Sequence, residues 1–133
     1  MLRFAAAIFV LYVVSAAAHA SGGEYEFTMP SRNVGCVYTP PGGTSTYTSP
    51  DGLAELQCDR VEPTYVRVIL GETGPAHRLN NVGDASCCGD NYILPYGEVW
   101  SEGPFTCLSA TTGLVCTRGH HGFTISRKSI ATY

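Results

Sequence analysis

Two adjacent cysteines, Cys87 and Cys88, are the residues of this chain best suited to chemistry. A cysteine thiolate is both a strong nucleophile and a soft metal ligand, so the pair could exchange disulfides or bind a metal ion. However, zinc sites usually space their ligands by two to four residues, and the chain has no C-x-x-C motif. We therefore treat a thiol-redox or metal-binding function at Cys87 and Cys88 as the alternative hypothesis.

A second group of candidates lies in the C-terminal part of the chain, where His120 and His121 stand between two glycines. Neighbouring side chains of an extended chain point to opposite faces, so two adjacent histidines rarely reach one metal ion. The pattern predicts a turn and no metal site. Exposed residues of this segment, His120, His121 and Arg127 among them, could instead contact a partner.

Aromatic residues give the other candidates for contact with a partner. Tyr96 lies in a Pro-Gly turn and is expected at the surface, where turns usually run. Trp100 is close to it in sequence and could join the same patch, but aromatic residues of strands usually face inward, which favours the core for Trp100. The candidate binding residues are therefore Tyr96, Trp100, His120, His121 and Arg127.

The sequence favours a binding protein over an enzyme. It has neither the G-x-S-x-G turn that carries the nucleophile of many serine hydrolases nor the H-E-x-x-H helix of metalloproteases. No motif places two catalytic groups together, and none implies a cofactor. We predict that the chain is not an enzyme.

The first twenty residues predict export. A positive Arg3 is followed by an apolar segment that is too short to span a membrane, and Ala18-His19-Ala20 matches a cleavage site for a signal peptide. We expect residues 1–20 to be removed and residues 21–133 to form a single β-rich domain. The domain would act in the periplasm or outside the cell, without a membrane anchor after cleavage.

The charge of the expected mature chain argues against nucleic acid as a partner. Without Arg3 it holds 7 basic and 11 acidic residues, a net charge of −4. It also lacks the basic stripe that binds phosphates. The partner is expected to be a protein or a glycan.

The candidate residues must be positioned by short strands. Turn signals rich in glycine and proline recur every eight to twelve residues, and apolar residues alternate between them, as over 25–29, 66–70 and 123–126. This pattern predicts a small all-β antiparallel sandwich or barrel. Ser49 and Pro50 could begin a short helix, but Ala54, Leu56 and Cys58 alternate as in a strand, which we favour. The segment 39–49 is expected to be an exposed loop.

Cysteines add a checkable pairing to this prediction. Six cysteines in a short exported chain indicate a disulfide framework. If Cys107 lies opposite Cys116 in an antiparallel pair, residue 109 lies opposite 114, and residues 110–113 form a tight hairpin. Directly opposed cysteines come close enough to form a disulfide.

Five blocks of sequence follow one another in the order of a known family: MPSRNVGC at 29–36, LQCD at 56–59, CCGD at 87–90, LPYG at 94–97 and GHHGFTISR at 119–127. In these blocks the chain resembles the small exported bacterial family called domain of unknown function 6636. The resemblance implies disulfides between Cys36 and Cys58 and between Cys107 and Cys116, and it brings no known activity.

The chain departs from that family at its central cysteine. Family members usually carry a cysteine before an aromatic W-G pair, whereas residues 61–70 contain neither cysteine nor tryptophan, and His121 is an additional histidine. Cys87 and Cys88 could bond to each other, remain reduced or pair between molecules. We expect a non-catalytic binding module of the bacterial envelope or the exterior, of which an inhibitor of an envelope-attacking hydrolase is one version.

Overall fold

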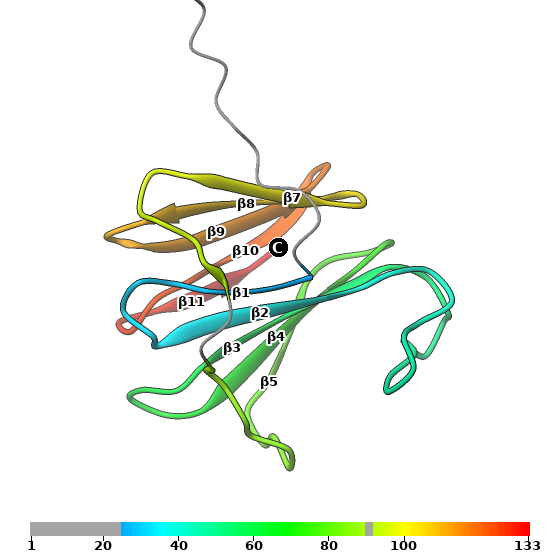
Figure 1. The fold of residues 1–133 in the computed structure, drawn as a ribbon, viewed down its shortest axis with the longest axis horizontal. Coiled ribbons are helices and arrows are strands. Elements are labelled where there is room, and N and C mark those ends of the chain that lie inside the picture. The colour runs from blue at the N-terminus through cyan, green and yellow to red at the C-terminus, as the bar shows by residue number, and fades with distance from the viewer. Residues whose placement is uncertain (1–24, 90–91) are drawn as a thin grey trace, which may run out of the picture.

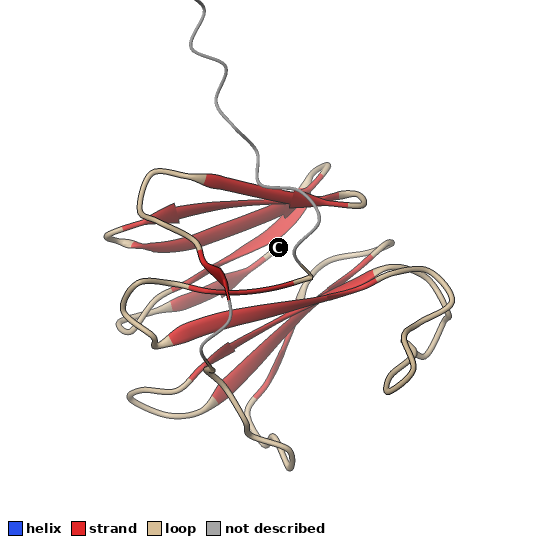
Figure 2. Cartoon of the chain, in the orientation of Figure 1, coloured by secondary structure: helices blue, strands red, loops and turns tan. Residues whose placement is uncertain are grey.

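The described part of the chain, residues 25–89 and 92–133, forms two β-sheets that pack face to face in the computed structural model (Figure 1). Figure 2 shows strands and connecting loops throughout this part. The all-β prediction is therefore confirmed. The predicted signal peptide, residues 1–20, lies outside the described residues. Within the described ranges, no helix is long and apolar enough to cross a membrane.

The first sheet contains the N-terminal half of the fold, in the order β5-β4-β3-β2-β1-β6. Its strands are β1 (Glu26–Thr28), β2 (Val34–Thr39), β3 (Glu55–Arg60), β4 (Val66–Gly71), β5 (His77–Leu79) and β6 (Tyr92–Ile93). The neighbouring strands are antiparallel except β6, which runs parallel to β1.

The second sheet is an antiparallel meander in the order β11-β10-β9-β8-β7. Its strands are β7 (Val99–Glu102), β8 (Phe105–Ala110), β9 (Gly113–Arg118), β10 (His121–Ile125) and β11 (Ile130–Thr132). Because each strand follows its neighbour in sequence, tight turns connect the strands, and these turns gather at the two ends of the sandwich.

The core lies between the sheets and is filled by every second residue of the long strands. In β4, for example, Val66, Val68 and Leu70 are buried, whereas Arg67 and Ile69 between them are half-buried on the other face. Trp100 is fully buried, and its ring centre lies 5.0 Å from that of Phe27. Trp100 is therefore part of the core, as the favoured interpretation predicts, and it is not a surface contact residue beside Tyr96.

Two disulfides lie inside this core. They join Cys36 to Cys58 and Cys107 to Cys116, the pairs that the resemblance implies, and each joins residues directly opposite each other on neighbouring strands. The predicted hairpin register is confirmed, because Ser109 lies opposite Leu114. The sulfur atoms of Cys36, Cys58 and Cys116 lie within 4.8 Å of one another, so the two disulfides meet across the sheets.

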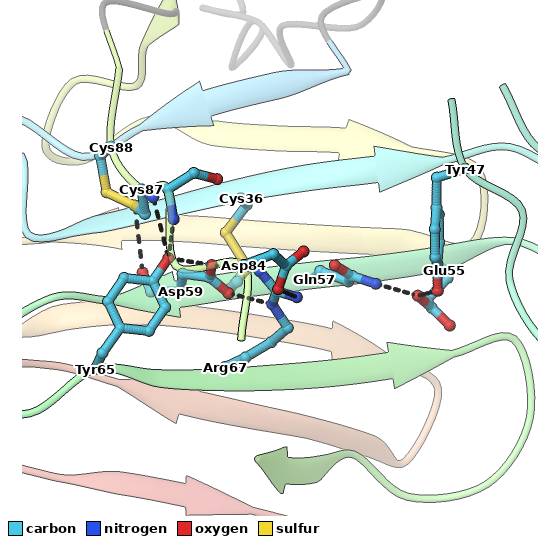
Figure 3. Close-up of polar contacts among 12 residues, drawn as sticks. Cys36, Tyr47, Glu55, Gln57, Asp59, Tyr65, Arg67, Asp84, Cys87 and Cys88 are labelled. Carbon is cyan, nitrogen blue, oxygen red and sulfur yellow. Dashed lines mark hydrogen bonds and ion pairs between the residues drawn. A yellow bond between two sulfur atoms is a disulfide. The ribbon is translucent and has the colours of Figure 1, made fainter. Parts of the chain in front are cut away.

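The segment between β2 and β3 contains no helix, and β3 begins at Glu55, as the favoured alternation predicts. This loop returns to the sheet through Tyr47, whose hydroxyl donates a 2.8 Å hydrogen bond to Glu55 (Figure 3). Burial of the phenol, followed by its hydrogen bond to Glu55, raises the pKa of Tyr47 to about 12.

Candidate functional site

A groove of about 580 Å³ opens at one end of the sandwich. We call it the end groove. It is bordered by the turn between β1 and β2, the turn between β8 and β9, the turn between β10 and β11, and Tyr96 from the loop before β7. Segments that are far apart in sequence thus meet in one concave surface.

The end groove has an apolar floor and a polar rim. Met29, Val34 and Ile125 belong to the buried core and also line the groove. The rim carries hydroxyl side chains, which belong to Ser31, Thr111, Thr112, Ser126 and Ser129. Such a surface can contact the apolar side of a ligand while its rim forms hydrogen bonds.

Two cations complete the rim of the end groove. Arg127 and Lys128 are exposed at the tip of the β10–β11 turn. In the described part of the chain, neither side chain has an ion-pair or hydrogen-bond partner. Because no carboxylate of residues 25–89 and 92–133 pairs with them, they give this end of the molecule a local positive charge that an anionic ligand would match.

The β10–β11 turn that carries these cations is fixed at both of its ends. Ser126 accepts a hydrogen bond from the amide of Ser129 at 3.1 Å, and the Ser126 amide donates to the Ser129 carbonyl at 2.9 Å. The guanidinium of Arg60 on β3 donates to the Ser126 carbonyl at 3.1 Å. The turn is therefore attached to the opposite sheet.

Arg60, which supports the groove from the first sheet, is buried and is not among the candidate residues predicted from the sequence. Besides Ser126, its side chain donates to the carbonyl of Thr64, and burial lowers the pKa of its guanidinium. A signal for it was present in the sequence, since the alternation of Ala54, Leu56 and Cys58 continues to position 60. That alternation predicts an inward-facing arginine, which needs polar partners.

Tyr96 lies on the surface, as its Pro-Gly turn predicts, with 43% of its area exposed. The turn closes with a 3.1 Å hydrogen bond from the Glu98 amide to the Pro95 carbonyl, and Gly97 adopts the positive φ of 88° that this turn requires. Gly97 also donates to the carbonyl of Ser109 at 2.7 Å. Strand β8 therefore holds the turn and presents the Tyr96 ring beside the groove.

The remaining candidates lie elsewhere. His120 and His121 are at the turn between β9 and β10, where His121 pairs with Arg118. Six residues of extended chain separate His121 from Arg127, a distance of about 20 Å. The structure therefore brings Tyr96 and Arg127 to one groove, but it places the two histidines at the other end of β10.

A second candidate site surrounds Cys87 and Cys88, which are bonded to each other (Figure 3). The two residues are half-buried, whereas the four other cysteines are fully buried. Their disulfide lies on the outer face of the first sheet, beside a pocket of about 160 Å³. Of the three alternatives left open for this pair, the structure shows the bond between neighbours.

Gly35 allows the disulfide to lie against β2. A Cβ atom built on Gly35 would lie 2.9 Å from Sγ of Cys87 and 3.0 Å from Sγ of Cys88. Real Cβ atoms essentially never come as close as the first distance, and the second is tighter than nearly all of their contacts. Any side chain at position 35 would therefore push the two sulfur atoms away from the sheet.

A polar network ties the loop that carries the disulfide to the first sheet. The hydroxyl of Tyr65 donates a 2.5 Å hydrogen bond to Asp59 and accepts bonds from the amides of Ser86 and Cys87 at 3.2 and 3.0 Å. Arg67 binds both oxygens of Asp59 at 2.8 and 2.9 Å, and it also reaches Asp84 at 3.0 Å (Figure 3).

This network raises the pKa of the Tyr65 phenol. Burial raises the pKa of Tyr65, and its hydrogen bond to Asp59 raises the pKa further. The same carboxylate holds the pKa of Arg67 above its ordinary value. A phenol of ordinary pKa is already protonated at neutral pH, and the raised pKa of Tyr65 extends its role as donor to Asp59 to more alkaline pH.

The described residues contain one cluster with the spacing of metal ligands, formed by Cys36, Cys58 and Cys116. All three sulfur atoms are already committed to disulfides. A disulfide sulfur has no thiolate charge to offer a metal ion. This cluster is therefore part of the core packing in the oxidised protein.

Comparison with known proteins adds no relative: no protein-family model, no curated protein and no solved structure matches the chain. The resemblance to the exported family consequently stays a prediction. What is established is the fold itself, an all-β sandwich with three disulfides, and disulfides of this number indicate an oxidising compartment.

Proposed function

We propose that this chain is an exported, non-catalytic binding module whose end groove takes an acidic glycan. The observation that carries this proposal is the position of two cations, Arg127 and Lys128, that have no partner among the described residues and lie beside the exposed ring of Tyr96 on one groove. The three disulfides support a site of action outside the reducing cytosol.

The chemistry of the groove supports a glycan in particular. A sugar ring has an apolar face that packs on an aromatic ring, and the exposed Tyr96 offers such a ring. Sugar hydroxyls both donate and accept hydrogen bonds, as do the serine and threonine hydroxyls of the rim. Arg127 can bind a carboxylate or sulfate with two parallel hydrogen bonds, which adds selectivity for acidic sugars.

The concave shape of the site favours this proposal over the inhibitor version. An inhibitor of a hydrolase usually inserts a protruding segment into the cleft of the enzyme, whereas the end groove receives a ligand. A protein partner remains the second expectation, and its outcome is included in the test.

The test is calorimetric titration at low salt with an acidic alginate oligosaccharide and a neutral dextran oligosaccharide of equal length. We expect alginate to bind and dextran to bind at least about tenfold more weakly, because a charge-assisted hydrogen bond contributes about 1.5–3 kcal/mol. Arg127→Met should weaken alginate binding by about tenfold or more, for the same reason. Added salt should also weaken it.

Arg78→Met is the matched control, since it removes the same charge from an exposed strand of the first sheet. The control should bind alginate as the wild type does. Equal binding of both oligosaccharides, equal losses in the two variants or no binding at all would each contradict the glycan proposal. Inhibition of a cell-wall hydrolase that survives Arg127→Met would favour the inhibitor version.

A further inference from the structure

The Cys87–Cys88 disulfide contributes little as a staple. A disulfide stabilises a fold mainly by restricting the unfolded chain, and this effect grows with the length of the loop that it closes. The two core disulfides join cysteines that are 22 and 9 positions apart in sequence, whereas Cys87 and Cys88 are neighbours. A bond between neighbours lowers the conformational entropy of the unfolded chain only slightly. Stabilisation of the fold therefore does not explain why this disulfide is present.

This disulfide is also more accessible than the two core disulfides. Both of its residues are half-buried and line the small pocket on the outer face of the first sheet, whereas the core disulfides are closed off between the sheets. Thiol–disulfide exchange requires a thiolate to approach a sulfur atom directly. The geometry therefore allows exchange at Cys87 and Cys88 under conditions that leave the core bonds intact.

A buried hydroxyl lies near the same two sulfur atoms. Thr28 is 1% exposed, and in the described part of the chain its Oγ1 has no hydrogen-bond partner. Thr28 lies directly opposite Gly35 on the neighbouring strand. The Cβ position of Gly35 that lies 2.9 and 3.0 Å from the two sulfurs is 3.4 Å from this Oγ1, so all three atoms lie close to one point.

An unpartnered buried hydroxyl costs free energy and requires an explanation. A sulfur atom in a disulfide is a weak hydrogen-bond acceptor, but a thiolate carries a full negative charge and is a much stronger one. The hydroxyl of Thr28 would therefore gain its partner at the moment when the disulfide opens.

We infer that Cys87–Cys88 is a thiol–disulfide exchange site that accepts two electrons from a dithiol, with Thr28 as the positioning residue that donates a hydrogen bond to the released thiolate. The site is separate from the end groove, because the two pockets share no lining residue. The inference therefore goes beyond the proposed glycan-binding function and does not depend on it.

The exchange proceeds in two balanced steps. One thiolate of the dithiol attacks a sulfur of the pair, the bond between Cys87 and Cys88 breaks, and the other sulfur leaves as the thiolate that Thr28 stabilises. The second thiolate of the dithiol then attacks the mixed disulfide and releases the second cysteine. The dithiol loses two electrons and two protons and becomes a disulfide, and Cys87 and Cys88 become two thiols.

The experiment equilibrates the purified oxidised protein with mixtures of reduced and oxidised dithiothreitol, followed by alkylation and mass spectrometry of each cysteine. We expect Cys87 and Cys88 to be alkylated together at ratios that leave the other four cysteines bonded. Thr28→Val keeps the shape but removes the hydroxyl. It should lower the equilibrium constant for reduction by about tenfold, which corresponds to about 30 mV.

Thr28→Ser is the conservative control, since it restores the hydroxyl, and it should return the equilibrium constant to within about twofold of the wild type. Simultaneous opening of all three disulfides, or equal constants for wild type and Thr28→Val, would overturn the inference. If Thr28→Val does not fold, Thr28→Ala replaces it, and the order in which the wild-type bonds open still decides whether the site exchanges.

Discussion

At the scale of single residues, the smallest side chain has a large effect on this molecule. Gly35 lies in the middle of the first sheet, where a β-branched residue would ordinarily be favoured. Its backbone conformation does not require glycine, because its φ angle is not positive. The requirement comes from the two sulfur atoms that lie against it, so the loop carrying the disulfide and the strand below it depend on each other.

Gly35→Ala should destabilise the oxidised protein by about 1–3 kcal/mol, the usual cost of forcing an extra methyl group into a packed site. Urea denaturation monitored by circular dichroism measures this change. Gly83→Ala is the control. Gly83 lies in the loop that carries the disulfide, and a Cβ atom there meets no atom within 4 Å. The cost should disappear when Cys87 and Cys88 are both replaced by alanine, and a cost that persists would contradict the packing argument.

The contact between Gly35 and the disulfide could not be predicted from the sequence, because the residues around Gly35 give no sign that two sulfur atoms from a distant loop lie against it. The same holds for the contact between Arg60 and Ser126: the alternation indicates that Arg60 faces inward, but its partner carbonyl lies on the other sheet. By contrast, the surface position of Tyr96 followed from its own turn, in which Pro95 and Gly97 set the backbone. Features that depend on neighbours in sequence were predictable, and features that depend on packing partners were not.

At the scale of elements, the alternation of apolar residues predicted β1, β3, β4 and β10, and the two cysteines predicted the register between β8 and β9. Three other short strands escaped prediction. Strands β5, β6 and β11 contain two or three residues each, and no alternation of apolar residues marks them in the sequence. The parallel pairing of β6 with β1 depends on how the chain runs from one edge of the first sheet to the other, and no local signal encodes it.

The groove turn between β10 and β11 illustrates the same dependence, because a residue of the other sheet holds it. Arg60→Met should destabilise the fold by about 1–3 kcal/mol, since the carbonyls of Ser126 and Thr64 lose their buried donor. Thermal unfolding measures the change, with the exposed Arg78→Met as the control, which should stay within about 0.5 kcal/mol of the wild type. Equal stability of the two variants would show that the arginine does not hold the turn.

At the scale of the whole molecule, the two sheets share one core in which the internal disulfides meet. Each disulfide joins strands of a single sheet, so the packing of sulfur against sulfur, and not a covalent bond, links the sheets at this point. The end groove exists only because this packing brings the turns of both sheets to one edge. For that reason the sequence could propose Tyr96 and Arg127 separately but could not place them together.

The two core disulfides should contribute unequally to stability. In the chain-entropy description, loops of 22 and 9 residues give about 3.4 and about 2.6 kcal/mol, so replacing Cys36 and Cys58 by alanine should cost about 0.8 kcal/mol more than replacing Cys107 and Cys116. All four cysteines are fully buried, so the loss of packing is comparable in the two variants. Urea denaturation of both variants measures the difference, and the opposite order would show that packing outweighs loop length.

The single tryptophan provides an internal optical reporter of this core. Trp100 lies directly opposite Cys107, so its indole is beside a disulfide that can quench its fluorescence by accepting an electron from the excited ring. Emission should therefore be dim while the sheets remain closed and should brighten once they separate or the neighbouring bond is cleaved. Events confined to the outer face, such as reduction of Cys87–Cys88, should leave the emission unchanged. A single fluorescence measurement would therefore distinguish reduction of this disulfide from unfolding.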